Sequence, residues 1–150
     1  VVKELVNDVW TDLAVVPAFG PGVGQFAKAV SMTNDFVALS APFQSAFSNQ
    51  ALTGAGNVYI YDLRLCSTSD CINNPPGLTA TIEGRQNERW GVDLSLVEIS
   101  PSEFWVAIGA TGVFDLSGKV YVYRVTPSTP PGVLGTWTPV GTPFVGGAEG

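Results

Sequence analysis

The chain contains no histidine and only two cysteines among its 150 residues. Without an imidazole it cannot assemble a Ser-His-Asp or Cys-His catalytic arrangement from its own residues. Two cysteines without a histidine also cannot complete a four-ligand zinc site. We therefore expect a protein that is not an enzyme and that holds no cofactor.

Charge is scarce and mostly negative. Only 13% of the residues are charged, and the formal net charge is −6. A nucleic-acid-binding protein needs a basic surface to neutralise phosphates, so we expect no nucleic-acid partner. No apolar run approaches the length that spans a bilayer, so we expect no membrane insertion. Low charge combined with abundant Ser, Thr, Gly and aromatic residues favours a secreted or cell-surface location.

The two cysteines, Cys66 and Cys71, are separated by four residues. Redox motifs have two intervening residues, so this spacing does not indicate a redox site. In an oxidising compartment the pair predicts a small loop disulfide that pins a hairpin. Two free thiols are the alternative.

A repeat is the most informative feature that is present. The stretch GNVYIYDL at 56–63 recurs as GKVYVYRV at 118–125, and VALSA at 37–41 recurs as VAIGA at 106–110. The sequence offset between matched residues stays constant within each stretch and changes only from one stretch to the next. Insertions therefore lie between the strands, as in structural repeats. Seventeen glycines and eleven prolines suit many short strands joined by turns.

Each copy predicts four strands, and the segment at 8–16 resembles an additional fourth strand that precedes the first copy. We therefore expect an all-β fold with almost no helix: a β-propeller segment of about two four-stranded antiparallel blades plus one extra strand. The strands fall at 26–32, 36–41, 57–63 and 77–84 in the first copy, and at 90–96, 104–110, 119–125 and 135–147 in the second. The expected units are 1–23 (fourth strand of a preceding blade and its loop), 24–87 (first blade) and 88–150 (second blade).

Patterning within the strands predicts which faces are buried. The second strands, 36–41 and 104–110, are almost continuously apolar, which predicts burial on both faces. In the first tyrosine strand, Val58 and Ile60 alternate with Tyr59 and Tyr61. This alternation predicts that the aliphatic side chains pack inward and that the tyrosines cover an outer face.

The repeat resembles FG-GAP repeats, the blades of integrin-α-type propellers. The family has Phe-Gly at the start of the first strand and Gly-Ala-Pro at the end of the second. The first copy has Phe26-Ala27 and 40–42 (Ser-Ala-Pro), and the second has Trp90-Gly91 and 109–111 (Gly-Ala-Thr). The resemblance implies a non-catalytic extracellular recognition or scaffold module of a larger secreted, cell-surface or appendage protein. The alternatives are a structural repeat of an extracellular filament or wall, and an accessory domain of a secreted hydrolase.

One departure from the family concerns calcium. Many such blades carry an Asp-x-Asp-x-Asp-Gly loop between the first two strands, whereas this chain has TND at 33–35 and EISPSE at 98–103. Neither turn supplies the oxygen ligands or the glycine that calcium loops use. The chain thus resembles the calcium-free subtype, and we expect no metal.

Ligand binding is expected on the propeller face that carries the loop 42–56, the segment 111–118 and the turns 17–24 and 84–89. These loops combine aromatic and polar residues, as recognition sites do. A local mini-core is the alternative for the loop 42–56, and Glu83 and Glu88 are expected to be solvated charges in turns. We expect a protein or glycan ligand, or neighbouring blades of the same or another chain, as partner. The candidate ligand-binding residues are Phe43, Gln44, Phe47, Arg89, Phe114 and Asp115.

Overall fold

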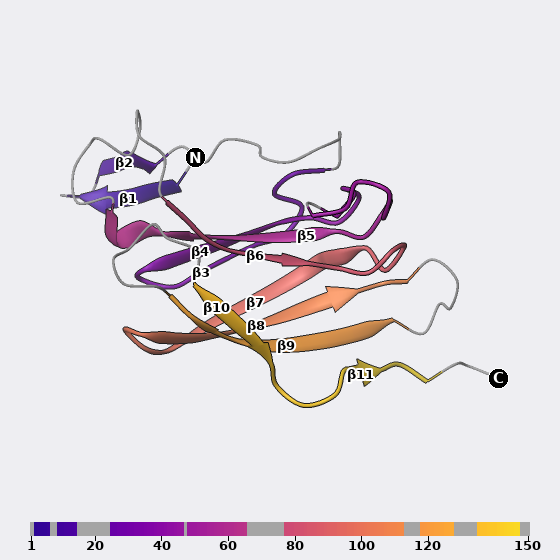
Figure 1. Cartoon of the computed structure of the whole chain (residues 1–150). Coiled ribbons are helices and arrows are strands. Elements are labelled where there is room, and N and C mark those ends of the chain that lie inside the picture. The colour runs from indigo at the N-terminus through magenta and orange to yellow at the C-terminus, as the bar shows by residue number, and fades with distance from the viewer. Residues whose placement is uncertain are drawn as a thin grey trace.

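The computed structural model describes residues 2–6, 9–14, 25–46, 48–65, 77–112, 118–127 and 135–147; for 2–14, 65 and 77–80 it describes the backbone only. Within these residues the fold is all-β, with a single 3₁₀ turn, η1 (Leu63–Leu65), and no α-helix. Two antiparallel sheets stack face to face (Figure 1). The expected all-β class is confirmed.

Each sheet is a meander, in which every strand pairs with its neighbour in sequence. The first sheet has the order β3-β4-β5-β6, and the second has the order β10-β9-β8-β7, with β11 pairing beside β10 on β9. The bounds of the first sheet are β3 (Val30–Met32), β4 (Phe36–Ala41), β5 (Asn57–Asp62) and β6 (Gly77–Glu83). Those of the second are β7 (Trp90–Ser100), β8 (Glu103–Ala110), β9 (Lys119–Thr126), β10 (Thr136–Pro139) and β11 (Phe144–Val145).

The N-terminal part differs from the expected single strand. Two strands, β1 (Val2–Val6) and β2 (Val9–Ala14), pair as an antiparallel hairpin outside both sheets. The strand β2 lies within the expected segment 8–16, whereas β1 was not predicted. Its sequence, VKELV, places two charged residues side by side and so lacks the alternation that marks a half-buried strand.

The strand register makes the two sheets equivalent position by position. Ser40 pairs with Val58 in the first sheet, and Gly109 pairs with Val120 at the matching place in the second. The edges follow the same rule, because β6 places Ile82 opposite Val58 and β11 places Phe144 opposite Val120. We call residues matched in this way counterparts.

Backbone dihedral angles repeat as well. Three pairs of counterparts have positive φ: Gln25 and Arg89 (23° and 52°), Ala27 and Gly91 (59° and 91°), and Gly56 and Gly118 (80° and 64°). A positive φ is uncommon for residues other than glycine, so its recurrence at Gln25 and Arg89 reflects a shared backbone path. The two copies therefore share backbone conformation as well as sequence.

The main core lies between the sheets, and the two faces that form it are not counterparts of each other. The first sheet contributes the face that carries Phe36, Val58 and Ile60, and the second contributes the face that carries Tyr121 and Tyr123. Val58 and Ile60 are the counterparts of Val120 and Val122, which lie on the opposite face of the second sheet from its tyrosines. The sheets thus stack head to tail, each offering a different face to the contact.

A second core occupies the other face of the first sheet. It contains Val37, Leu39, Ala41, Tyr59, Tyr61 and Leu63, with Phe26 packed against it. In the first sheet Val58 and Ile60 face the second sheet and Tyr59 and Tyr61 lie on the other face, as the alternation predicts. That outer face is nevertheless buried, because Tyr59 and Tyr61 are 0% and 4% exposed. A tyrosine ring buries as readily as an aliphatic side chain, so the alternation does not show whether a face is covered.

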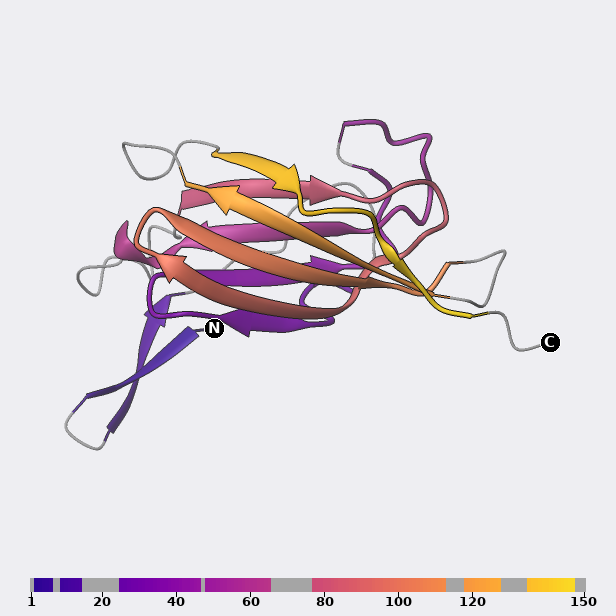
Figure 2. The same ribbon diagram turned by 90° about the horizontal axis from the view of Figure 1, so that it is seen from below.

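The second strands behave differently in the two sheets. All six residues of β4 are buried, as the unbroken apolar run predicts. In β8 the prediction of burial on both faces is wrong, since burial alternates and Trp105 is exposed. The outer face of the second sheet thus exposes apolar side chains such as Trp105 and Val120. The second sheet lies in the foreground of Figure 2.

Candidate binding site at the long-loop end

The loops expected to form a ligand-binding face gather at one end of the stack. The long-loop end comprises the described residues 42–46, 48–56, 84–89 and 111–112 (right side of Figure 1). Backbone hydrogen bonds join its two main segments: Asn87 N donates to Thr53 O (3.1 Å), Arg89 N to Gly54 O (3.0 Å) and Gly84 N to Gly56 O (2.9 Å). These bonds connect the β4–β5 loop to the turn between β6 and β7. The two segments therefore form one continuous surface rather than separate loops.

Phe43 and Arg89, predicted from distant positions in the sequence, lie together at this end. The guanidinium carbon of Arg89 lies 5.2 Å from the centroid of the Phe43 ring, and the ring is 43% exposed. Such a cation–π contact at an exposed site contributes about 0.5–1 kcal/mol. Neither Arg89 nor the nearby Arg85 forms an ion pair with another described residue. The pair thus presents an aromatic ring and a guanidinium group side by side at this end of the stack.

Gln44 has a different place from the one predicted. Its side chain is 3% exposed, and its Oε1 accepts hydrogen bonds from Tyr59 OH (2.7 Å) and Asn57 Nδ2 (3.3 Å). Asn57 Nδ2 also donates to Ser45 O (2.8 Å). Gln44 therefore fixes the start of the long loop to β5, beneath the surface that Phe43 occupies. These contacts give part of the loop the mini-core character that was the alternative interpretation.

Glu83 anchors the middle of the same loop. Its carboxylate accepts hydrogen bonds from the backbone N of Ser48 (2.8 Å) and from the Ser48 hydroxyl. A carboxylate that accepts a backbone N–H and a hydroxyl together makes a charge-assisted contact. The expectation of a purely solvated charge is therefore wrong for Glu83.

Glu88 is also engaged, in a network that sequence reasoning missed. Its carboxylate accepts hydrogen bonds from Trp90 Nε1 (2.7 Å), Tyr121 OH (2.9 Å) and Lys119 Nζ (2.9 Å). Burial raises the pKa of Glu88, but the hydrogen bonds from Lys119, Trp90 and Tyr121 outweigh it and hold the pKa below its usual value of 4.5. Glu88 thus ties the turn before β7 to β9.

Several predicted residues fall outside the described part of the chain. Phe47, Phe114 and Asp115 belong to this group, so their assignment to a ligand site stays a prediction. The same holds for the predicted disulfide between Cys66 and Cys71. The structure therefore brings together Phe43 and Arg89, and places Gln44 beneath them.

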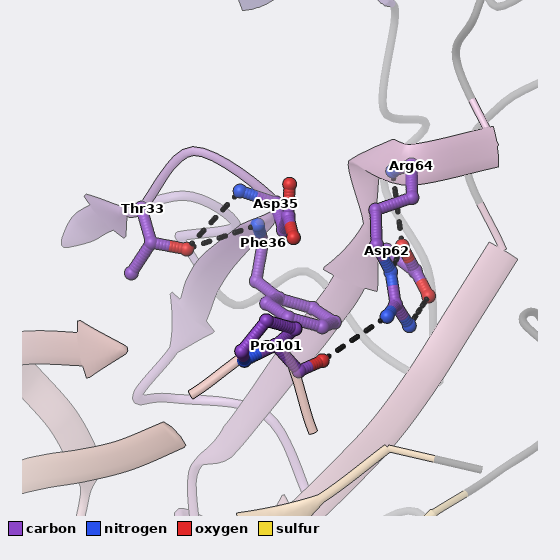
Figure 3. Close-up of polar contacts among 6 residues, drawn as sticks. All are labelled: Thr33, Asp35, Phe36, Asp62, Arg64 and Pro101. Atoms are coloured by element: carbon purple, nitrogen blue, oxygen red, sulfur yellow. Dashed lines mark hydrogen bonds and ion pairs between the residues drawn. The ribbon is translucent and has the colours of Figure 1, made fainter. Parts of the chain in front are cut away.

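The opposite end of the stack carries a different polar cluster (Figure 3). The Arg64 guanidinium donates two hydrogen bonds to the carboxylate of the fully buried Asp62, from Nε to Oδ1 (2.9 Å) and from NH2 to Oδ2 (2.6 Å). The same guanidinium donates to Pro101 O (3.2 Å) of the second sheet and lies 4.9 Å from the ring centroid of Phe36. Arg64 therefore links the two sheets at this end.

The turn at 33–35, examined above for calcium, is closed by a hydroxyl. Thr33 Oγ1 accepts hydrogen bonds from the backbone N of Asp35 (3.3 Å) and of Phe36 (3.1 Å). Across the described ranges, no three His, Cys, Asp or Glu side chains come close enough to hold a metal ion. The expected absence of calcium stays a prediction.

Comparison with family models, characterised proteins and solved structures gave no match. None of the described residues forms a helix that is long and apolar enough to cross a membrane. Any assignment of function must therefore come from the geometry of the chain itself.

Proposed function

We propose that the chain is a segment of an FG-GAP-type β-propeller, consisting of two successive four-stranded blades. The support comes from the stacking of the sheets. A propeller repeats one operation from blade to blade, so each blade offers one face to the blade before it and the other face to the blade after it. The head-to-tail contact between the Val58 face of the first sheet and the Tyr121 face of the second has this property.

The outer faces distinguish a propeller segment from a closed two-sheet sandwich. In a sandwich the inward-facing residues form the core and the outward-facing ones are polar. Here the outer face of the first sheet is a second apolar core, and the outer face of the second sheet exposes Trp105, Val120 and Phe144. The outer face of the first sheet is therefore apolar and already covered, whereas that of the second sheet is open to a further contact.

The function that we propose is extracellular recognition without catalysis, at the long-loop end. The observation that carries it is the exposed Phe43 ring beneath the Arg89 guanidinium, held on a loop that Gln44 and Glu83 fix to the sheet. Aromatic and arginine side chains are over-represented among residues that dominate binding energies. The partner is a protein or a glycan, with Phe43 as the contact and Arg89 as the charge.

An array of defined glycans and extracellular-matrix proteins tests this function. The wild-type chain should bind a subset of the array, and Phe43→Ala should weaken that binding about tenfold or more, as for a residue that dominates a contact. Because Phe43 is exposed, the variant should lose little beyond the cation–π contact, and its melting temperature should fall by no more than about 4 °C. Ile99→Ala is the matched control, since Ile99 is an exposed apolar residue at the opposite end. No binding by the wild type, or equal loss in both variants, contradicts the proposal.

A structural role in an extracellular filament or wall is the second candidate. It is favoured by the open apolar face of the second sheet, which is suited to contact with another repeat. In that case binding in the array should be absent and the chain should serve only as a spacer between repeats.

A further inference from the structure

The outer face of the second sheet contains an apolar pocket of about 420 Å³. Its lining comes from β7, β8, β9 and β11 and the residues next to them. The second sheet lies in the foreground of Figure 2. The residues that line it are Val92, Gly109, Ala110, Gly118, Lys119, Val120, Phe144, Val145 and Gly146.

The matching place on the first sheet is filled by Trp90 and Gly91. A Cβ on Gly91 would lie 2.5 Å from Ser40 Cβ, and a Cβ on Gly84 would lie 2.5 Å from the Trp90 ring. A Cβ on Gly56 would lie 2.4 Å from the backbone N of Trp90. Contacts this short leave no room for a side chain at Gly56, Gly84 or Gly91. Ser40, Gly56 and Gly84 thus form a seat that the aromatic–glycine pair Trp90-Gly91 fills.

The counterparts of the three seat residues are Gly109, Gly118 and Gly146, and all three line the pocket. The backbone bond that shapes the seat is repeated too. Gly84 N donates to Gly56 O at 2.9 Å, and Gly146 N donates to Gly118 O at 3.1 Å. The pocket is therefore a second copy of the seat, and no aromatic–glycine pair of the described residues lies in it.

The surface around the pocket is exposed, whereas the matching surface of the first sheet is buried. Phe36, Val58 and Ile82 are 0% exposed in the first sheet, whereas their counterparts Trp105, Val120 and Phe144 are 36%, 42% and 68% exposed. A contiguous apolar surface of this kind indicates an interaction site. The first sheet shows what covers it, namely the tyrosine-bearing face of the following sheet.

Gly109 supports this interpretation, because no described residue of the chain requires a glycine there. A Cβ at Gly109 would lie 3.5 Å from Val92 Cγ2 and 3.6 Å from Asp93 Cβ, which are ordinary contacts, and its φ lies outside the left-handed region. The missing side chain keeps the pocket open instead.

We propose that this pocket receives an aromatic–glycine pair that begins the first strand of a further four-stranded unit. The aromatic ring lies over Gly146 and the glycine lies against Gly109, as Trp90 and Gly91 do on the first sheet. The inference rests on the equivalence of the two sheets and not on ligand recognition at the long-loop end, so either can fail without the other.

An extended chain tests the proposal, with residues 85–147 repeated directly after Gly146. The junction is natural because Gly84, which precedes Arg85, is the counterpart of Gly146. The repeated unit supplies its own copy of Trp90-Gly91 to the pocket. Hydrogen exchange of the backbone amides at 118–122 and 144–146 should slow about tenfold or more relative to the original chain, because the amides become covered.

Two variants at Gly109 make the test specific. Gly109→Phe fills the pocket and should abolish the added protection, while leaving the melting temperature of the original chain unchanged. Gly109→Ser should keep the protection, because Ser40 already accommodates Gly91 on the first sheet. Exchange that is equally fast in the original and extended chains overturns the proposal, and so does protection that survives Gly109→Phe.

A measurement on the original chain covers the remaining outcomes. If the extended chain fails to fold, the peptide of residues 87–96 is titrated into the original chain and followed by NMR. Chemical-shift changes centred on Gly109, Gly118 and Phe144 support the proposal, and their absence overturns it. Protection of the pocket that rises with the concentration of the original chain also overturns it, because a second copy is then the occupant.

Discussion

At the level of single residues, the same backbone conformation occurs at a glycine in one copy and at an alanine in the other. Gly91 and its counterpart Ala27 both adopt a positive φ, at 91° and 59°. Gly91 is also pressed against Ser40, whereas Ala27 is exposed. The position therefore requires glycine in the second copy and tolerates alanine, with some strain, in the first.

Opposite effects should follow from exchanging these two residues. Gly91→Ala should lower the free energy of unfolding by more than about 2 kcal/mol, because strain at positive φ adds to overpacking. Ala27→Gly should raise it by about 0.5 kcal/mol, because relief of strain exceeds the added freedom of the unfolded chain. Urea denaturation of both variants measures the pair. Equal effects of the same sign would show that the two positions are not equivalent.

Glu88 predicts a dependence of stability on pH. Its pKa is lowered in the folded state, so the stabilisation is present above the usual value of 4.5 and is lost as the pH falls through the folded pKa. Glu88→Gln should therefore be less stable than the wild type at pH 7, and the difference should shrink on acidification. Urea midpoints between pH 7 and pH 3 measure this.

The control for the altered net charge is Glu103→Gln. Glu103 accepts a hydrogen bond from Trp105 Nε1 (3.1 Å) at the surface, away from the Glu88 network. A difference between wild type and Glu88→Gln that stays constant with pH would mean that the carboxylate charge is not what stabilises the network.

At the level of the elements, the repeat predicted the order of the strands in both sheets, because the matched residues are those that a sheet needs at fixed positions. Two bounds differ: the expected strand 26–32 begins only at Val30, and the expected strand 135–147 is two short strands, β10 and β11. The matched stretches at 37–41 and 106–110 occupy matched registers against β5 and β9. What the repeat could not predict lies where the copies differ. Glu88 corresponds to Gly24 in the first copy, so no recurring signal marked its network.

The candidate site was predictable only in part. Phe43 and Arg89 were identified because aromatic and arginine residues in adjoining loops indicate recognition, and they are in contact. Gln44 has the same composition-based signal, yet its amide serves Tyr59 and Asn57 inside the loop. Whether a polar side chain points inward depends on the path of the loop, which a single sequence does not encode locally.

Arg64 joins the elements at the other end, and its removal should be costly. Arg64→Ala leaves the buried Asp62 carboxylate without its cation, which should lower the free energy of unfolding by about 3 kcal/mol. Arg124, the exposed counterpart of Asp62, provides the control: Arg124→Ala should change stability by less than about 0.5 kcal/mol. Chemical denaturation at pH 7 compares them. Similar small losses in both variants would mean that Arg64 does not hold the sheets together.

At the level of the whole molecule, both proposals depend on how the two sheets stack. The tyrosine face of the second sheet packs on the aliphatic face of the first, and each sheet keeps a further apolar face. The propeller assignment and the pocket proposal both follow from this head-to-tail relation. A like-to-like stacking of the two sheets would remove the basis for both.

Nuclear Overhauser contacts between the sheets test this relation most directly. We expect cross-peaks between Phe36 and Phe104, whose ring centroids lie 4.5 Å apart, and between a Val58 methyl group and the Gly91 α-protons. We expect no contact between the Tyr59 and Tyr121 rings, because those rings lie in different cores. Cross-peaks between these two tyrosines, together with loss of the Val58–Gly91 contact, would contradict it.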